Sequence, residues 1–130
     1  MSLHFHFIVV TNNPLVRERF EGQVPLDYQP RTFAGILEYV RDQIHKGHKL
    51  LSHPLSGSVK PGETPYKSIM ISAEQGALDT DSVILIEDCI QHAKKFRDRI
   101  SGLSERVLDD FQLVDCNLIT SAIESALTGH

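Results

Sequence analysis

The chain has 130 residues and a mass of 14.6 kDa, with 41% hydrophobic and 23% charged residues, the proportions of one globular domain over residues 1–130. Its formal charge of −4 argues against a nucleic-acid binder, because such domains are usually strongly basic. No apolar run approaches the roughly 18 residues of a membrane helix and no signal peptide opens the chain, so we expect a cytoplasmic protein without membrane contact.

The first residues predict two strands with a helix between them. The apolar run that ends at Val10 is typical of a buried strand, which we place at residues 3–10. Asn13 is suited to cap a helix that starts at Pro14, because the missing proline N–H is not needed there. A short second strand follows at residues 24–29.

A longer helix and a third strand come next. Thr32 is suited to cap a helix whose apolar residues recur at helical spacing: Phe33, Ile36, Leu37, Val40 and Ile44. Gly47 ends this helix as a left-handed cap, and residues 48–52 predict a strand. Strands that alternate with single helices indicate βαβ units and a parallel sheet.

The second half begins with a loop at residues 53–66, followed by a fourth strand at residues 67–72. A helix opens at Asp79 or Asp81, and Gly102 ends it. The last helix carries a wide apolar arc: Val107, Leu108, Phe111, Val114, Leu118, Ile119, Ala122, Ile123 and Ala126. We therefore expect a single three-layer α/β domain, Rossmann-like, with about four mainly parallel strands flanked by helices and a C-terminal helical pair.

A candidate ligand site combines the turn after the first strand with the long loop. In open parallel sheets, ligands bind beyond the carboxyl ends of the strands, where both segments are expected to lie. The asparagines would orient a ligand, the serines and glycine would supply donors, and the lysines would supply charge. The predicted binding residues are Thr11, Asn12, Asn13, His53, Ser56, Gly57, Ser58, Lys60, Thr64 and Lys67.

Local charge favours an anion as the ligand of this site. Residues 44–68 carry a net charge of +3, whereas the other residues carry −7, and a cationic segment in an acidic protein attracts small anions. Two alternatives stay open: the loop docks a protein partner, or it is a rigid crossover whose lysines only keep it solvated.

Catalytic and metal-binding chemistry have weaker signals. His53 and Glu63 are candidate general acids or bases, while the P-loop and dinucleotide-binding patterns are absent, so we expect no cofactor. Cys89 is expected in the core, and neither it nor Cys116 has a partner at ligand spacing. His4 and His6 share one face of the first strand, but two histidines do not complete a zinc site, and we expect no metal.

Two segments resemble the GrdX family. They are Thr-Asn-Asn-Pro-Leu-Val at residues 11–16 and the stretch from Gly47 to Ser68, which includes His-Pro-Leu-Ser-Gly-Ser-Val-Lys-Pro and Glu-Thr-Pro-Tyr-Lys-Ser. The resemblance implies a small protein encoded in the glycine reductase operons of amino-acid-fermenting anaerobic bacteria. That system uses selenoprotein and thiol components and yields acetyl phosphate, and the family supplies no catalytic residues to carry over.

The residues and the resemblance together favour an accessory or regulatory protein of the glycine, sarcosine or betaine reductase pathway. It would bind a small anionic metabolite or a reductase component through the Asn12–Asn13 turn and the loop at residues 53–67. The alternative is a small-molecule enzyme, a lyase, isomerase or phosphate-handling hydrolase, that uses His53 or Glu63. A third hypothesis is a homodimer formed through the apolar arc of the last helix.

Overall fold

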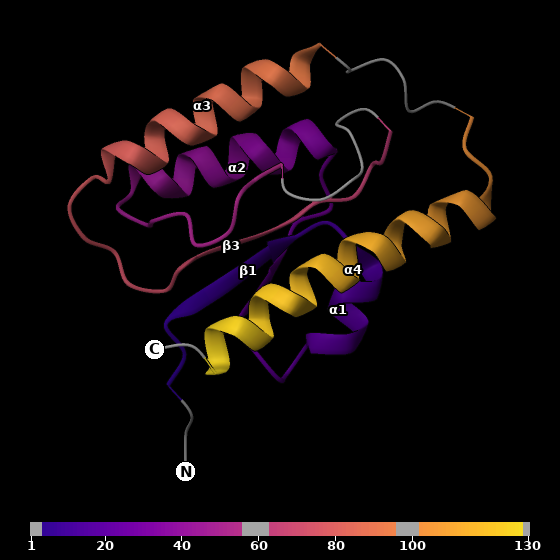
Figure 1. Ribbon diagram of the computed structural model, residues 1–130, viewed down its shortest axis with the longest axis horizontal. Coiled ribbons are helices and arrows are strands. Elements are labelled where there is room, and N and C mark those ends of the chain that lie inside the picture. The colour runs from indigo at the N-terminus through magenta and orange to yellow at the C-terminus, as the bar shows by residue number, and fades with distance from the viewer. Residues whose placement is uncertain (1–3, 56–62, 96–101, 129–130) are drawn as a thin grey trace.

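The computed structural model describes residues 4–55, 63–95 and 102–128, and in these ranges the chain forms three strands and four helices (Figure 1). In chain order they are β1 (Phe7–Thr11), α1 (Pro14–Phe20), β2 (Leu26–Tyr28), α2 (Phe33–His45), β3 (Ser68–Ser72), α3 (Thr80–Lys94) and α4 (Glu105–Thr128). None of these helices combines the length and the apolar character that crossing a membrane requires.

The described sheet is mixed, with strand order β2-β1-β3. β1 pairs with β2 in parallel and with β3 in antiparallel register, which places Thr11 opposite Ser68 and Phe7 opposite Ser72. The expected fold of about four mainly parallel strands in a Rossmann-like arrangement is therefore wrong.

The third predicted strand, at residues 48–52, forms only an isolated antiparallel bridge between Leu50 and Ile71. Side chains replace part of the backbone ladder here. Met70 N donates to the hydroxyl of Ser52 at 2.8 Å, and Leu50 N donates to the hydroxyl of Ser82 at 3.0 Å. A regular strand would pair these N–H groups with backbone carbonyls, so the segment lies along β3 without extending the sheet.

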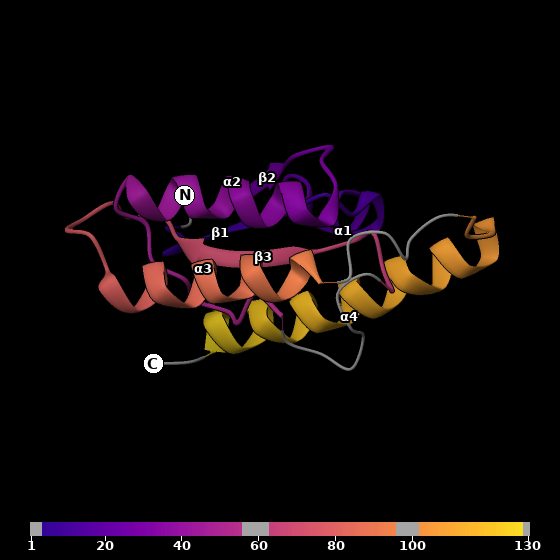
Figure 2. The ribbon, with the colours of Figure 1, turned by 90° about the horizontal axis from the view of Figure 1, so that it is seen from above.

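Helices cover both faces of the sheet, α2 and α3 on one side and α1 and α4 on the other (Figures 1 and 2). The strand side chains alternate accordingly: Val10, Ile69 and Ile71 pack against α2 and α3, and Phe7, Val9 and Met70 pack against α1 and α4. The sheet therefore separates α3 from α4, and the expected C-terminal helical pair is wrong. The apolar arc of α4 packs against the sheet and α1 instead of against α3.

The expected starts of α1, α2 and α3 and the expected end of α2 are confirmed, whereas α3 ends at Lys94 and not at the expected Gly102. Asn13, Thr32 and Asp79 cap α1, α2 and α3, and each side chain accepts a hydrogen bond from a backbone N–H of the first turn. After α2, Gly47 has a positive φ of 106° and donates its N–H to Ile44 O. His48 N donates to Gln43 O, which completes the capping motif that glycine favours at this position.

Candidate functional site

The end of β1 and the start of β3 meet at one edge of the sheet, because the two strands run antiparallel. Asn12 joins them: its Oδ1 accepts from Lys67 N at 2.8 Å, and its Nδ2 donates to Pro65 O at 2.8 Å and to Arg31 O at 2.9 Å. The turn after β1 and the residues that precede β3 therefore do lie together. Antiparallel pairing brings them there, and not the parallel strand order expected from the sequence.

Asn13 also joins separate elements, and it links the turn to α4. Its Oδ1 accepts from Leu15 N at 3.0 Å, and its Nδ2 donates to Gln112 O at 2.9 Å and to Asp115 Oδ2 at 3.0 Å. Both asparagines thus hold elements together at this edge. Their predicted role in orienting a ligand stays a prediction.

Asp115 of α4 is the centre of a buried polar network. Ser68 donates to it twice, from N to Oδ1 at 3.0 Å and from Oγ to Oδ2 at 2.7 Å. Since the Ser68 hydroxyl proton is used in that bond, the Thr11 hydroxyl donates to Ser68 Oγ at 2.6 Å and itself accepts from Asn13 N. This chain of bonds ties α4 to both β1 and β3.

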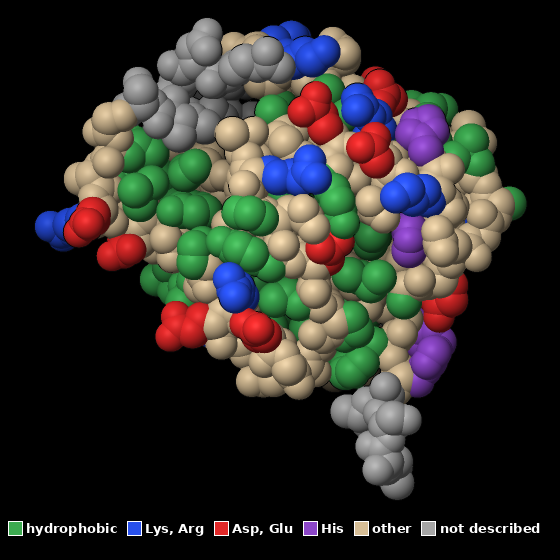
Figure 3. Space-filling view, turned by 180° about the vertical axis from the view of Figure 1, so that it is seen from behind, with side chains coloured by type: hydrophobic (Ala, Val, Ile, Leu, Met, Phe, Trp, Pro, Cys, Tyr) green, Lys and Arg blue, Asp and Glu red, His purple; other side chains and the backbone are tan. Residues whose placement is uncertain are grey.

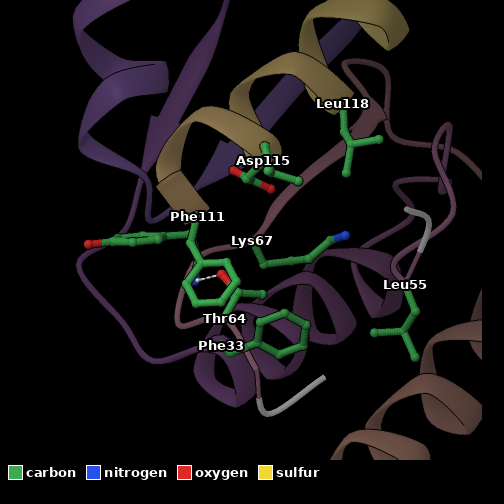
Figure 4. A pocket seen from close by; sticks show the side chains of 9 residues that line it. Phe33, Leu55, Thr64, Lys67, Phe111, Asp115 and Leu118 are labelled. Carbon is green, nitrogen blue, oxygen red and sulfur yellow. Dashed lines mark hydrogen bonds between the residues drawn. The ribbon is translucent and has the colours of Figure 1, made fainter. Parts of the chain in front are cut away.

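A pocket of about 20 Å³ opens beside this network, between α2, α4 and the segment before β3 (Figure 4). That space matches one or two water molecules, which each need roughly 10–15 Å³ by this measure. Most of the wall is apolar, and its polar side chains come from α4 and from the segment before β3. The lining residues are Phe33, Leu55, Thr64, Tyr66, Lys67, Phe111, Val114, Asp115 and Leu118.

Lys67, the residue before β3, extends across this pocket, with its amino group directed between Leu55 and Leu118 (Figure 4). Among the residues that the structure describes, it is the only lysine or arginine with less than a tenth of its surface exposed, at 6%. Burial lowers the pKa of the Lys67 ammonium, and the nearby Asp115 carboxylate opposes this shift without cancelling it. Lys67 is therefore a largely buried cation near the Asp115 carboxylate, which accepts three hydrogen bonds from Ser68 and Asn13.

The other predicted site residues are distributed differently. Thr64 is buried in the pocket wall, and its hydroxyl accepts from Tyr66 N at 3.1 Å. His53 and Glu63 are exposed and are not among the residues that line the pocket, and His53 Nδ1 accepts from Leu55 N. Four further candidates lie outside the described residues: Ser56, Gly57, Ser58 and Lys60.

Sequence reasoning missed Asp115 and the apolar walls. The signal for Asp115 was present, since it stands four residues after Phe111 and four before Ile119, in the middle of the apolar arc. An acid at such a position is costly to bury unless donors surround it, which marks it as structural or functional. The apolar walls carried no separate signal, because Phe33 and Phe111 match ordinary core positions of their helices.

Both cysteines are buried, as expected for Cys89, and the structure pairs neither in a disulfide. Burial raises the pKa of the Cys89 thiol, and Asp88 adds to the shift. Cys116 accepts a hydrogen bond from Arg19 at 3.6 Å. Both thiol groups are thus enclosed by the fold and are not presented at the described surface.

The outer side of α4 is partly apolar beyond the pocket. Val114 and Leu118, at the pocket edge, are 36% and 38% exposed, and Leu113 is more exposed still. Exposed apolar residues at a helix surface are consistent with a contact to another protein. The homodimer through this helix stays a prediction.

Comparison with known proteins gives one result. The chain matches the family of GrdX-like proteins over residues 8–124, which includes every described element except the start of β1 and the end of α4. No curated protein and no solved structure matches the chain. The match spans both segments that carry the resemblance, and it covers most of the sequence, so the chain belongs to the GrdX-like family.

Proposed function

We propose that the Lys67 pocket binds the carboxylate or phosphate group of a small metabolite. On this proposal the chain acts as an accessory or regulatory protein of the glycine reductase pathway. Family membership supports the link with glycine reductase operons. The observation that carries the binding proposal is the buried lysine in an otherwise mainly apolar pocket.

The electrostatic argument starts from the cost of burying a cation. An ammonium group in a mainly apolar site loses hydration, and an anion brought next to it restores much of the lost stabilisation. Burial lowers the pKa of Lys67 although Asp115 attracts its ammonium, and a bound anion would oppose this lowering. The Asp115 carboxylate accepts hydrogen bonds from Ser68 and Asn13, and these bonds reduce the repulsion between the carboxylate and a bound anion.

The size of the pocket restricts the ligand class. About 20 Å³, the space of one or two water molecules, accommodates the two oxygen atoms of a carboxylate or two of the oxygen atoms of a phosphate group, and little more. The remainder of a two- or three-carbon metabolite would extend toward Leu55 and Leu118, two of the partly exposed apolar side chains of the lining. Products of reductive deamination, such as acetyl phosphate and acetate, combine a small apolar group with an anionic one and match this description.

The test is an amide-resolved NMR titration with acetate, phosphate and acetyl phosphate, with uncharged acetamide as the control ligand. We expect saturable shifts at Thr64, Lys67, Asp115 and Leu118 with at least one anion and none with acetamide. Lys67→Met should abolish the shifts, whereas Lys49→Met, which removes an exposed lysine of the same chain region, should leave them unchanged. Absence of saturation at millimolar anion, or equal binding by Lys67→Met, would contradict the proposal.

The same titration addresses the enzyme alternative. His53 and Glu63 have less support as acid or base, because both are exposed and neither belongs to the pocket lining. Under our proposal His53→Ala binds the anion as the unmodified chain does, and no ligand is converted to a new compound during the experiment. Turnover of acetyl phosphate that disappears in His53→Ala would favour the enzyme instead.

A further inference from the structure

The N-terminal end of the described chain carries a cluster of two histidines and a glutamate. His4 and His6 precede β1, and Glu74 follows β3, 68 residues after His6. One ligand atom from each of the three side chains lies within 4.8 Å of the other two. Figure 3 shows histidine side chains along one edge of the back face, beside the N-terminal end of the described chain. The cluster lies at the other end of β1 from the Lys67 pocket, about 20 Å away along the strand.

We propose that His4, His6 and Glu74 form a binding site for a divalent transition-metal ion of the Zn²⁺ type. Two imidazoles and one carboxylate are a ligand set that proteins use for zinc, and three protein ligands leave a fourth position for water or for a group from a partner. Imidazole nitrogens also disfavour Mg²⁺ and Ca²⁺, which select oxygen ligands.

The distances suit a tetrahedral ion. Zinc bonds of roughly 2.0–2.1 Å separate neighbouring ligand atoms by about 3.3 Å. The observed separations lie on either side of this value: Glu74 Oε1 is 2.7 Å from His6 Nδ1 and 3.8 Å from His4 Nε2. All three side chains are more than half exposed, so small rotations about their side-chain bonds can bring them to the required spacing.

The backbone already holds the two segments together. Ala73 N donates to His6 O at 2.9 Å, and the Ser72 hydroxyl donates to Glu74 O at 2.9 Å. The rings of His4 and His6 are in edge-to-face contact at 4.7 Å. Binding of an ion would therefore require little further ordering of the two backbone segments.

The test uses the chain without an affinity tag, titrated at neutral pH with Zn²⁺ by calorimetry and with Co²⁺ by visible absorption. We expect one ion per chain and the intense Co²⁺ bands of tetrahedral coordination. His6→Ala and Glu74→Gln should each weaken binding by roughly tenfold or more, since even outer ligand partners contribute that much. His45→Ala removes an exposed histidine at the end of α2 and serves as the matched control.

Two outcomes would overturn the site. One is the absence of both heat and Co²⁺ bands with the unmodified chain. The other is equal affinity in the unmodified chain and in the double variant His6→Ala/Glu74→Gln. Misfolding does not confuse the comparison, because the replaced side chains are exposed and a thermal melt checks each variant. The result is also independent of the anion titration, which concerns residues at the opposite end of β1.

Discussion

A buried lysine normally costs stability, and Lys67 therefore links the stability of the protein to its proposed function. Its pKa in the folded state is below the unfolded value of 10.5, because burial disfavours the ammonium. Between these two pKa values the unfolded chain binds more protons than the folded chain. The contribution of Lys67 to stability is thus least favourable below the folded pKa and recovers as the pH rises toward 10.5.

Lys67→Met should remove this dependence. We expect the variant to be more stable than the unmodified chain by about 1–2 kcal/mol at neutral pH, with the difference shrinking as the pH approaches 10.5. Urea unfolding at a series of pH values measures both effects, and Lys49→Met is the control for loss of an exposed lysine. A less stable Lys67→Met at neutral pH would mean that Lys67 is retained for its attraction to Asp115, which would weaken the case for a binding role.

At the scale of the elements, the end of α2 depends on one glycine. Gly47 has a positive φ and also lies against the loop after β3, where a Cβ would come within 2.4 Å of Gly76 O. Gly47→Ala should therefore combine backbone strain with a backbone clash and cost about 3 kcal/mol in the free energy of unfolding. Gly22→Ala has a positive φ but free space around the new Cβ, so it should cost about 1 kcal/mol.

Gly76→Ala completes this comparison, since nothing lies within 4 Å of its added Cβ. It should be near neutral. Denaturant unfolding of the three variants separates the two contributions. If Gly47→Ala and Gly22→Ala lower the free energy of unfolding equally, the loop after β3 moves aside at little cost. The strain of the positive φ alone would then account for the effect of Gly47→Ala.

The elements also show what local sequence determines. Asn13, Thr32 and Asp79 act through hydrogen bonds within two or three residues, so the starts of α1, α2 and α3 could be predicted. The segment at residues 48–52 has strand-like composition, but its pairing depends on Ser82 and Met70, which are distant in sequence. The expected parallel direction of the strands was wrong for the same reason. Packing and the chain connections decide whether β3 joins the sheet parallel or antiparallel to β1, and residue propensity does not encode them.

The candidate site shows the same difference between local features, which could be predicted, and contacts between distant residues, which could not. Lys67, Thr64 and the Asn12–Asn13 turn were predicted from charge, donors and position after a strand, and they lie together. The position of Asp115 in the apolar arc was a signal that was missed, but its partners Ser68 and Asn13 could not be predicted, because they are 47 and 102 residues away. Such contacts appear only when the order of the strands and the face covered by α4 are known.

For the molecule as a whole, Asp115 is a buried polar connection between α4 and the sheet, and Gln112 adds hydrogen bonds with Asn13 and Tyr66. Around it, Cys116, Ile119 and Ile123 make apolar contacts with the sheet, which are less directional than hydrogen bonds. Asp115 instead accepts hydrogen bonds from both β1–α1 and β3, which fixes the position of the helix along its axis. The wall of the Lys67 pocket that α4 provides depends on that position.

Asp115→Ala should therefore destabilise the protein by about 3 kcal/mol, because it leaves Ser68 N, Ser68 Oγ and Asn13 Nδ2 buried with fewer acceptors. Asp110→Ala, which removes an exposed acid of the same helix, should change stability by less than about 0.5 kcal/mol. Hydrogen exchange gives the more specific readout: in Asp115→Ala the amides of α4 should lose protection before those of β1 and α2. If all elements lose protection equally, α4 is held mainly by its apolar contacts, and the pocket would keep its shape without the network.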